Sequence, residues 1–109
     1  MTTPPPAEVL PPAFTESILF LPVRDLAASH AFYANGLGLP LALDQGTCRI
    51  YRIARHAFMG ICQRDRVMPS EGVMLTLVTT DVAAWHRTLV TRGLSIEVAP
   101  RFNPQYQIV

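Results

Sequence analysis

Two histidines in matching contexts are the residues of this chain with the clearest potential for chemistry. RDLAASHAF contains His30 and TDVAAWHRT contains His86, and the two stretches align with a constant offset of 56 residues. Histidine changes its charge near neutral pH and ligates metals, so a pair could serve as acid and base or hold an ion. Whether these two side chains meet depends on the elements that carry them.

The same offset pairs Asp25 with Asp81, and each stands directly before a helical pattern. A carboxylate at that point accepts hydrogen bonds from the free backbone N–H groups of the first turn, so we interpret both aspartates as helix caps and not as catalytic acids. His30 and His86 then lie on helix faces, bonded to backbone or solvent. The match therefore indicates duplicated architecture rather than a catalytic dyad. His56 is expected to be exposed in a turn.

The two cysteines, Cys48 and Cys62, show neither a CxxC motif nor the spacing of zinc ligands. The N-terminal segment lacks a basic stretch followed by an apolar core, so it is not typical of a signal peptide. We therefore predict two reduced thiols in a cytoplasmic protein, acting as small apolar fillers. Their nearly symmetric spacing about Arg55 and His56 would place them on neighbouring strands.

Composition limits the classes of partner. The 109 residues carry a net charge of +1, and all nine basic residues are arginine. No run of basic residues offers a footprint for nucleic acid. No apolar stretch approaches the roughly 20 residues that span a bilayer. We therefore expect neither a nucleic-acid partner nor a membrane partner. Because 50% of the residues are hydrophobic, the chain can bury a core.

The hydrophobic pattern contains one structural unit followed by a partial copy of it. Residues 17–23 favour a strand, a helix ends near Gly36 and Gly38, and three short strands joined by turns follow. The pattern then restarts at the stretch VMLTLVT. The restarted pattern consists of a strand at 73–79, a helix at 82–92, a strand at 94–99 and a final strand that begins at 105.

This order predicts an α+β protein built from two modules. Residues 1–14 form a Pro-rich flexible arm, residues 15–66 a first βαβββ module, and residues 67–109 a second βαβββ module that lacks its last strand. One strand and one helix cannot bury their own apolar faces, so the two modules are expected to share a core. Trp85 in the second helix is expected to lie in that core, since large aromatics dominate core packing.

The motifs LPVRDLAASHAFYANGLGLPL and LVTTDVAAWHRTLVTRGL resemble the vicinal oxygen chelate superfamily, which includes glyoxalases, bleomycin-resistance proteins, fosfomycin-resistance enzymes and extradiol dioxygenases. Phe32-Tyr33 and Leu37-Gly38-Leu39 match characteristic points of its first module. The resemblance covers about residues 17–109. It implies two βαβββ modules that place their sheets side by side as a curved half-barrel, with the helices outside and a ligand cleft inside.

The resemblance also locates the usual metal ligands of the superfamily. Ile18 and Met74, separated by the repeat offset of 56, stand at the ligand position of the first strand of each module, and Gly60 stands near a third. Isoleucine and glycine have no donor, and a thioether suits soft ions rather than those that polarise oxygen substrates. We therefore expect no metal, no cofactor and no enzymatic activity of the usual kind. The final carboxylate position lies beyond this sequence.

Strand alternation extends this reasoning to the cleft. If Ile18 and Met74 point inward, Phe20 and Thr76 share their apolar floor, and an arginine beside it would favour an anionic ligand. Further polar candidates on the later strands and loop are Arg52, Gln63 and Asn103. The predicted ligand-binding residues are Phe20, Arg49, Tyr51, Met74, Thr76, Arg101 and Tyr106.

These observations predict a metal-independent protein that binds or sequesters a small hydrophobic or anionic molecule in its concave cleft, similar to the bleomycin-resistance branch and acting as a homodimer. The alternative is a metal-dependent glyoxalase-like lyase or extradiol-type dioxygenase, which would need ligands elsewhere in the chain. A third hypothesis is a structural or regulatory dimer whose cleft is filled by Phe20 and Met74. The identity of the ligand, and whether the natural chain continues past Val109, stay open.

Overall fold

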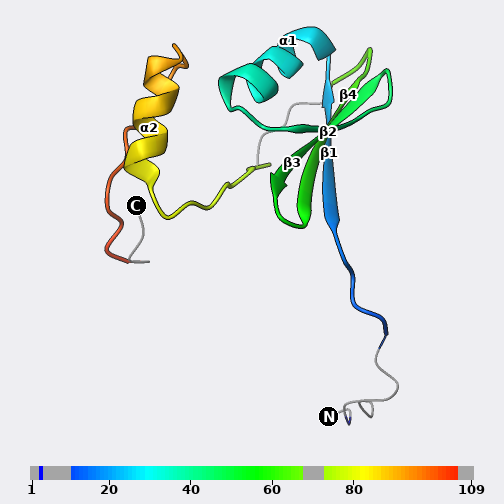
Figure 1. Ribbon diagram of the computed structural model, residues 1–109, viewed down its shortest axis with the longest axis horizontal. Coiled ribbons are helices and arrows are strands. Elements are labelled where there is room, and N and C mark those ends of the chain that lie inside the picture. Colours follow the sequence, from blue (N-terminus) through cyan, green and yellow to red (C-terminus); the bar gives the residue numbers. More distant parts are fainter. Residues whose placement is uncertain (1–2, 4–10, 68–72, 106–109) are drawn as a thin grey trace.

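The computed structural model describes residue 3 and residues 11–67 and 73–105 (Figure 1). Its elements, in chain order, are β1 Ser17–Val23, α1 Leu26–His30, the π-helical η2 Ala31–Gly36, β2 Leu41–Asp44, β3 Cys48–Ala54, β4 Ala57–Gln63 and α2 Val82–Thr91. The first half thus has the expected order of strand, helix and three strands. Within the described residues, no helix has the length and apolar character needed to cross a membrane.

The four strands form one open, mixed sheet in the order β1-β4-β3-β2. β1 runs parallel to β4, whereas β3 is antiparallel to both of its neighbours. The register places Gly60 between Phe20 on one side and Ile50 on the other. Because successive side chains alternate between the faces of a sheet, this register decides which residues of each strand share a face.

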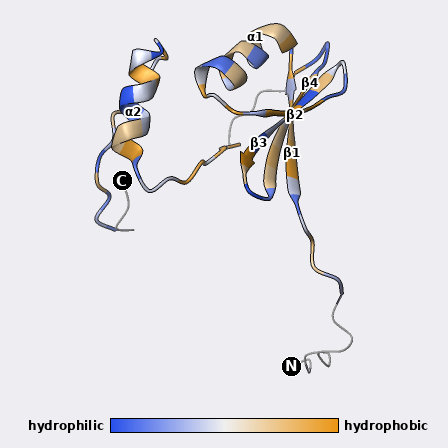
Figure 2. Cartoon of the chain, viewed as in Figure 1, coloured by the Kyte–Doolittle hydropathy of each residue, from blue (hydrophilic) through white to orange (hydrophobic). Residues whose placement is uncertain are grey.

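One face of the sheet is covered by α1 and η2, and the core lies between these layers (Figures 1 and 2). Leu26 of the helix packs with Tyr51, Met59 and Ile61 of the central strands, and all four are buried. The expectation that the first helix covers one side of the sheet is confirmed. We call the opposite side, turned away from α1 and η2, the open face.

Both helices begin with the capping hydrogen bond that the sequence predicts. Asp25 Oδ1 accepts from the backbone N–H of Ala28 at 3.1 Å, and Asp81 Oδ1 accepts from that of Ala84 at 2.9 Å. The repeat therefore extends to the individual hydrogen bond, and the interpretation of both aspartates as caps is confirmed. His56 is exposed in the turn between β3 and β4, also as expected.

His30 has a partner that the sequence does not reveal. Its Nδ1 lies 2.7 Å from the hydroxyl oxygen of Tyr51, so the expectation of a bond to backbone or solvent is wrong. Tyr51 is fully buried, and a buried hydroxyl without a partner would cost free energy. His30 thus serves to satisfy a core tyrosine. Burial raises the pKa of Tyr51 above its ordinary value, because it disfavours the phenolate, and nearby Arg49 partly offsets the effect.

The second half forms its helix but not the strands expected around it. The described segments 73–79 and 94–99 have no strand structure, which corrects the prediction for both. In the first half β1 pairs with β4, and adding the repeat offset of 56 to the bounds of β4 gives 113–119, outside these 109 residues. A strand without a partner leaves its backbone groups unpaired, and among the described residues segment 73–79 pairs with none of the four strands of the sheet.

Few contacts connect α2 with the first half. The guanidinium Nη1 of Arg92 donates to the carbonyl of Gly36 at 2.9 Å, and Leu94 packs against the same glycine, where an added Cβ would come within 3.2 Å of it. Figure 1 shows α2 beside the α1–η2 helix rather than over the sheet. Leu75 also packs against the first core.

The cysteines correct a second expectation. Cys48 and Cys62 lie directly opposite each other on β3 and β4, as their spacing suggested, but they are joined in a disulfide rather than held as free thiols. Their Cα atoms are 4.1 Å apart. The register of β3 against β4 brings the two side chains within bonding reach, and the absence of a signal-peptide pattern does not reveal this pairing.

We expect Tyr51→Phe to lower the free energy of unfolding by about 1 kcal/mol at neutral pH, because it removes the hydrogen bond to His30. Urea unfolding followed by circular dichroism measures this difference.

The same pair predicts a pH dependence. The neutral phenol is favoured in the folded state, so its contribution is fully present below the unfolded pKa of 10.0 and is lost as pH rises towards the raised folded pKa of Tyr51. The difference in free energy of unfolding between wild type and Tyr51→Phe should therefore shrink as the pH rises above 10.0. A difference that stays constant across this range would show that Tyr51 does not titrate with a raised pKa.

Candidate functional site

The open face collects the alternate residues of all four strands. By register they are Ile18, Phe20 and Pro22 of β1, Phe58, Gly60 and Cys62 of β4, Cys48, Ile50 and Arg52 of β3, and Leu43 of β2. Ile18 is 47% exposed, Phe20 49% and Leu43 51%. Ile50 and Phe58 of the two central strands are buried, so the exposed apolar carbon of this face lies on the edge strands β1 and β2, and α1 and η2 cover the other side of the sheet.

Phe20 packs closely against Gly60 on this face. A Cβ atom on Gly60 would stand 2.5 Å from two carbons of the Phe20 ring, so the ring lies against the bare backbone of β4. Glycine is required here to admit the ring, since a real Cβ does not approach another carbon so closely. Any side chain at position 60 would compete with Phe20 for this space.

Arg52 provides the positive charge of the open face. Its guanidinium carbon lies 4.8 Å from the centre of the Phe58 ring, which is a cation–π contact. The partner is fixed by the sheet, because Arg52 and Phe58 stand opposite each other on β3 and β4. Arg52 is exposed, so its remaining N–H donors can reach an anion. The sequence named Arg52 as a polar candidate but gave no sign of its aromatic partner.

The three positions compared with metal ligands do not converge. Ile18 and Gly60 share the open face by register, but Met74 lies in the segment without strand structure and is 84% exposed. Within residue 3 and residues 11–67 and 73–105, no group of three His, Cys, Asp or Glu side chains is arranged to hold a metal ion. The residue types at positions 18 and 60 carry this argument, because neither has a donor atom.

The predicted ligand-binding residues of β3 lie on the other side of the sheet from Phe20. Tyr51 is fully buried against α1 and therefore does not line the open face. Arg49, two residues earlier on β3, points to the same face as Tyr51 and forms a salt bridge with Asp44, with 3.5 Å between Arg49 Nε and Asp44 Oδ2. That Nε atom is buried and has no hydrogen-bond partner among the described residues. The structure thus separates Arg49 and Tyr51 from Phe20, although all three were predicted to line one cleft.

The remaining predicted residues belong to the second half. Met74 and Thr76 are exposed on the segment that leads to α2, and Arg101 is exposed on the loop after it. None of them contributes to the open face of the first sheet. Tyr106 falls outside the described residues.

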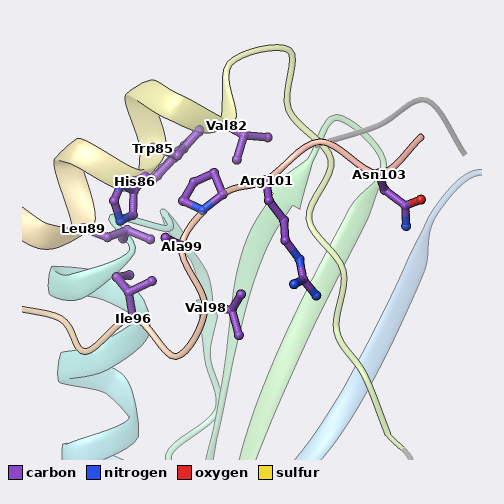
Figure 3. A pocket seen from close by; sticks show the side chains of 10 residues that line it. Val82, Trp85, His86, Leu89, Ile96, Val98, Ala99, Arg101 and Asn103 are labelled. Atoms are coloured by element: carbon purple, nitrogen blue, oxygen red, sulfur yellow. The ribbon is translucent and has the colours of Figure 1, made fainter. Parts of the chain in front are cut away.

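A hollow of about 520 Å³ lies between α2 and the loop that follows it (Figure 3). It is lined by Val82, Trp85, His86, Leu89, Ile96, Val98, Ala99, Pro100, Arg101 and Asn103. A second, apolar hollow of about 290 Å³ shares Val82, Trp85 and Leu89 with it and is also lined by Leu37, Leu39 and Ile53 of the first half.

These hollows show that the apolar stripe of α2 is incompletely covered. Trp85 is 42% exposed, so the prediction that it is a core residue is wrong. The physical reason is that the described segments 73–79 and 94–99, which were expected as strands beneath α2, form no sheet. His86, the repeat partner of His30, faces the larger hollow and has no counterpart of Tyr51 among the described residues, because the matching position, 107, falls outside them.

Solved structures share this fold. A glyoxalase/bleomycin resistance protein/dioxygenase from Nocardioides matches with a TM-score of 0.61 and 16% identity, over 90% of this chain and 74% of that one. An integron cassette protein from the mobile metagenome of V. cholerae matches with a TM-score of 0.57 and 14% identity, over 89% of this chain and 82% of that one. The expected resemblance is confirmed at the level of the fold. No protein-family model and no curated protein matches the chain.

We expect Gly60→Ala to lower the free energy of unfolding by about 1–2 kcal/mol, because the added methyl group displaces the Phe20 ring. The same substitution in a Phe20→Ala background should cost much less, since the ring is then absent. A double-mutant cycle by urea unfolding isolates this coupling. Equal costs in the two backgrounds would show that Phe20 does not occupy the space above Gly60.

Proposed function

We propose that this chain is a metal-independent protein that binds or sequesters a small apolar or amphipathic anion on the open face. The observation that carries the proposal is the half-exposed Phe20 ring, which lies against Gly60 beside the exposed side chain of Ile18. The fold shared with the Nocardioides structure, named a glyoxalase/bleomycin resistance protein/dioxygenase, supports this class of function.

The shape and chemistry of the open face favour a flat ligand. Exposed apolar patches on a protein surface commonly mark sites of interaction. The exposed side chains of Ile18 and Phe20 lie on the same face of β1. An aromatic ligand could stack on the Phe20 ring in the offset geometry that aromatic pairs prefer. Arg52 at the edge of this surface would pair with a carboxylate, which the guanidinium binds through two N–H groups.

Binding without bond breaking is favoured over the metal-dependent alternative by the residue types of the face. A lyase or dioxygenase of this fold needs about three protein ligands with an open coordination position. Ile18 and Gly60 supply no donor, and the Phe20 ring occupies the space above Gly60. A bound molecule would therefore meet carbon and a guanidinium rather than a Lewis acid.

A homodimer is the second part of the proposal. Met74 and Val78 of the unpaired segment are 84% and 94% exposed, and Val98 and Phe102 are 62% and 61% exposed. A surface with this much exposed apolar carbon is stabilised by burial against another protein surface. A second copy of the chain would provide it and would also give segment 73–79 backbone groups to pair with.

A cytoplasmic location stays a prediction from the sequence. Stable disulfides are typical of oxidising compartments, so a permanent Cys48–Cys62 bond would argue against the cytoplasm. A bond that is reversibly reduced and reformed is compatible with a cytoplasmic location.

Ligand binding is tested with flat aromatic carboxylates and the matching neutral amides. We expect the carboxylates to bind more tightly, and Phe20→Ala to weaken binding about tenfold, as the loss of one stacked aromatic contact predicts. Isothermal calorimetry on protein treated with EDTA measures both. Leu19→Ala is the matched control, because Leu19 is the next residue of β1, is 44% exposed and points to the other face.

Three results would overturn this proposal. Binding that appears only after a divalent ion is restored would favour the metal-dependent alternative. Equal losses in Phe20→Ala and Leu19→Ala would place the ligand elsewhere. Saturable binding by no member of the panel would leave the structural dimer as the better hypothesis.

The homodimer is tested by sedimentation equilibrium over a wide range of concentrations. We expect a reversible dimer, and we expect Val78→Asp to weaken it, because a charge would be buried at the interface. Glu97→Ala, on an exposed residue of the same half, is the control. A monomer at all concentrations would contradict the proposal.

A further inference from the structure

The disulfide joins the two central strands of the sheet at a position where the backbone already brings them together. The backbone N–H of Gln63 donates to the carbonyl of Thr47 at 2.8 Å, which makes Cys48–Cys62 a non-hydrogen-bonded pair of the antiparallel ladder, the type with the shorter Cα separation. Their proximity therefore comes from the β3–β4 pairing and does not depend on the bond between the sulfurs. We therefore expect reduction to leave two thiols facing each other in a sheet that keeps its hydrogen bonds.

The cysteines border a depression that small molecules can enter. It measures about 430 Å³ and opens at the end of the sheet where β4 finishes. Its lining is Phe20, Leu21, Pro22, Gln45, Cys48, Cys62 and Arg64. Cys48 is partly exposed, whereas Cys62 is only 7% exposed. An incoming reagent therefore reaches Cys48 first.

Arg64 gives this depression a positive charge. Its Nη1 donates to the carbonyl of Gln63 at 2.8 Å, which holds the side chain near the end of β4. None of the described residues that line the depression is acidic. A guanidinium beside a thiol favours the thiolate, the reactive form, and it also attracts anionic molecules.

We propose that Cys48 and Cys62 form a reversible thiol–disulfide site that exchanges with low-molecular-weight anionic thiols and disulfides. Cys48 is the attacking residue, Cys62 the resolving residue, and Arg64 attracts the anionic reagent. The depression shares Phe20 with the proposed ligand surface, but the exchange reaction does not depend on ligand binding there.

The exchange balances in two steps. The Cys48 thiolate attacks one sulfur of the small disulfide, which forms a mixed disulfide and expels one small thiolate. The Cys62 sulfur then attacks the Cys48 sulfur of that mixed disulfide, forms the Cys48–Cys62 bond and expels the second small thiolate. The protein loses two electrons and two protons, and the small disulfide gains them as two thiols. The reverse sequence reduces the protein.

The full chain is equilibrated in buffers with graded ratios of glutathione to glutathione disulfide, starting from the reduced and from the oxidised protein. Acid quenching, alkylation and mass spectrometry then count dithiol, mixed disulfide and disulfide. We expect both starting states to converge on one curve that runs from fully reduced to fully oxidised, with an unchanged circular dichroism spectrum. We also expect Cys62→Ser to accumulate the mixed disulfide at Cys48, and Cys48→Ser to accumulate little.

Two results would overturn the reversible site. A disulfide that resists excess glutathione until the protein unfolds would be a purely structural bond. Thiols that stay reduced in excess glutathione disulfide would mean that the bond does not form. Equal accumulation of mixed disulfide in the two serine variants would overturn the assigned order of attack.

The role of Arg64 is tested by rates. Arg64→Gln should slow oxidation by glutathione disulfide severalfold relative to oxidation by the neutral 2-hydroxyethyl disulfide. Arg66→Gln is the matched control, because Arg66 is exposed, carries the same charge and does not line the depression. If Arg64→Gln and Arg66→Gln slow oxidation by glutathione disulfide equally, Arg64 has no specific role. The same conclusion follows if Arg64→Gln slows oxidation by glutathione disulfide and by 2-hydroxyethyl disulfide equally.

Discussion

The parallel pairing of β1 with β4 is the constraint on which the rest of the structure depends. It joins the first and last strands of the first unit, so α1, η2, β2 and β3 all lie within the loop that it closes. Parallel neighbours require a crossover, and here the helix crosses on one side only. That single crossover produces both the buried core and the open face. The same pairing sets Phe20 opposite Gly60.

The second half shows what happens when this pairing has no counterpart. Its helix forms because a capped helix satisfies most of its own backbone groups, and Asp81 provides the cap. Its strands need partners outside their own segments, and the described segments 73–79 and 94–99 form no strand. Among the described residues Trp85 therefore has no sheet beneath it, and it is 42% exposed.

The local signals of the sequence were sufficient for the elements of the first half and for both helix caps, because these depend on neighbours within a few residues. The face occupied by Tyr51 could not be predicted, since it requires the register of β3 against β4, which shifts between Arg52 and Ala54. The disulfide was missed for a related reason. The expected compartment predicts only whether disulfides are common in proteins of that class. The direct cross-strand pairing places Cys48 beside Cys62 in any compartment.

The alternation of side chains along β3 thus separates the core residues of the sheet from those of the open face. The odd-numbered residues of β3, represented by Tyr51, provide the core and its hydrogen bond to His30. The even-numbered ones provide Cys48 and Arg52 to the open face, where β4 adds Gly60 between them. Arg52 contacts the ring of Phe58, the second residue of β4, and Arg64 directly follows the end of the same strand. The pairing of β3 with β4 thus places apolar carbon along β4 between two guanidinium groups.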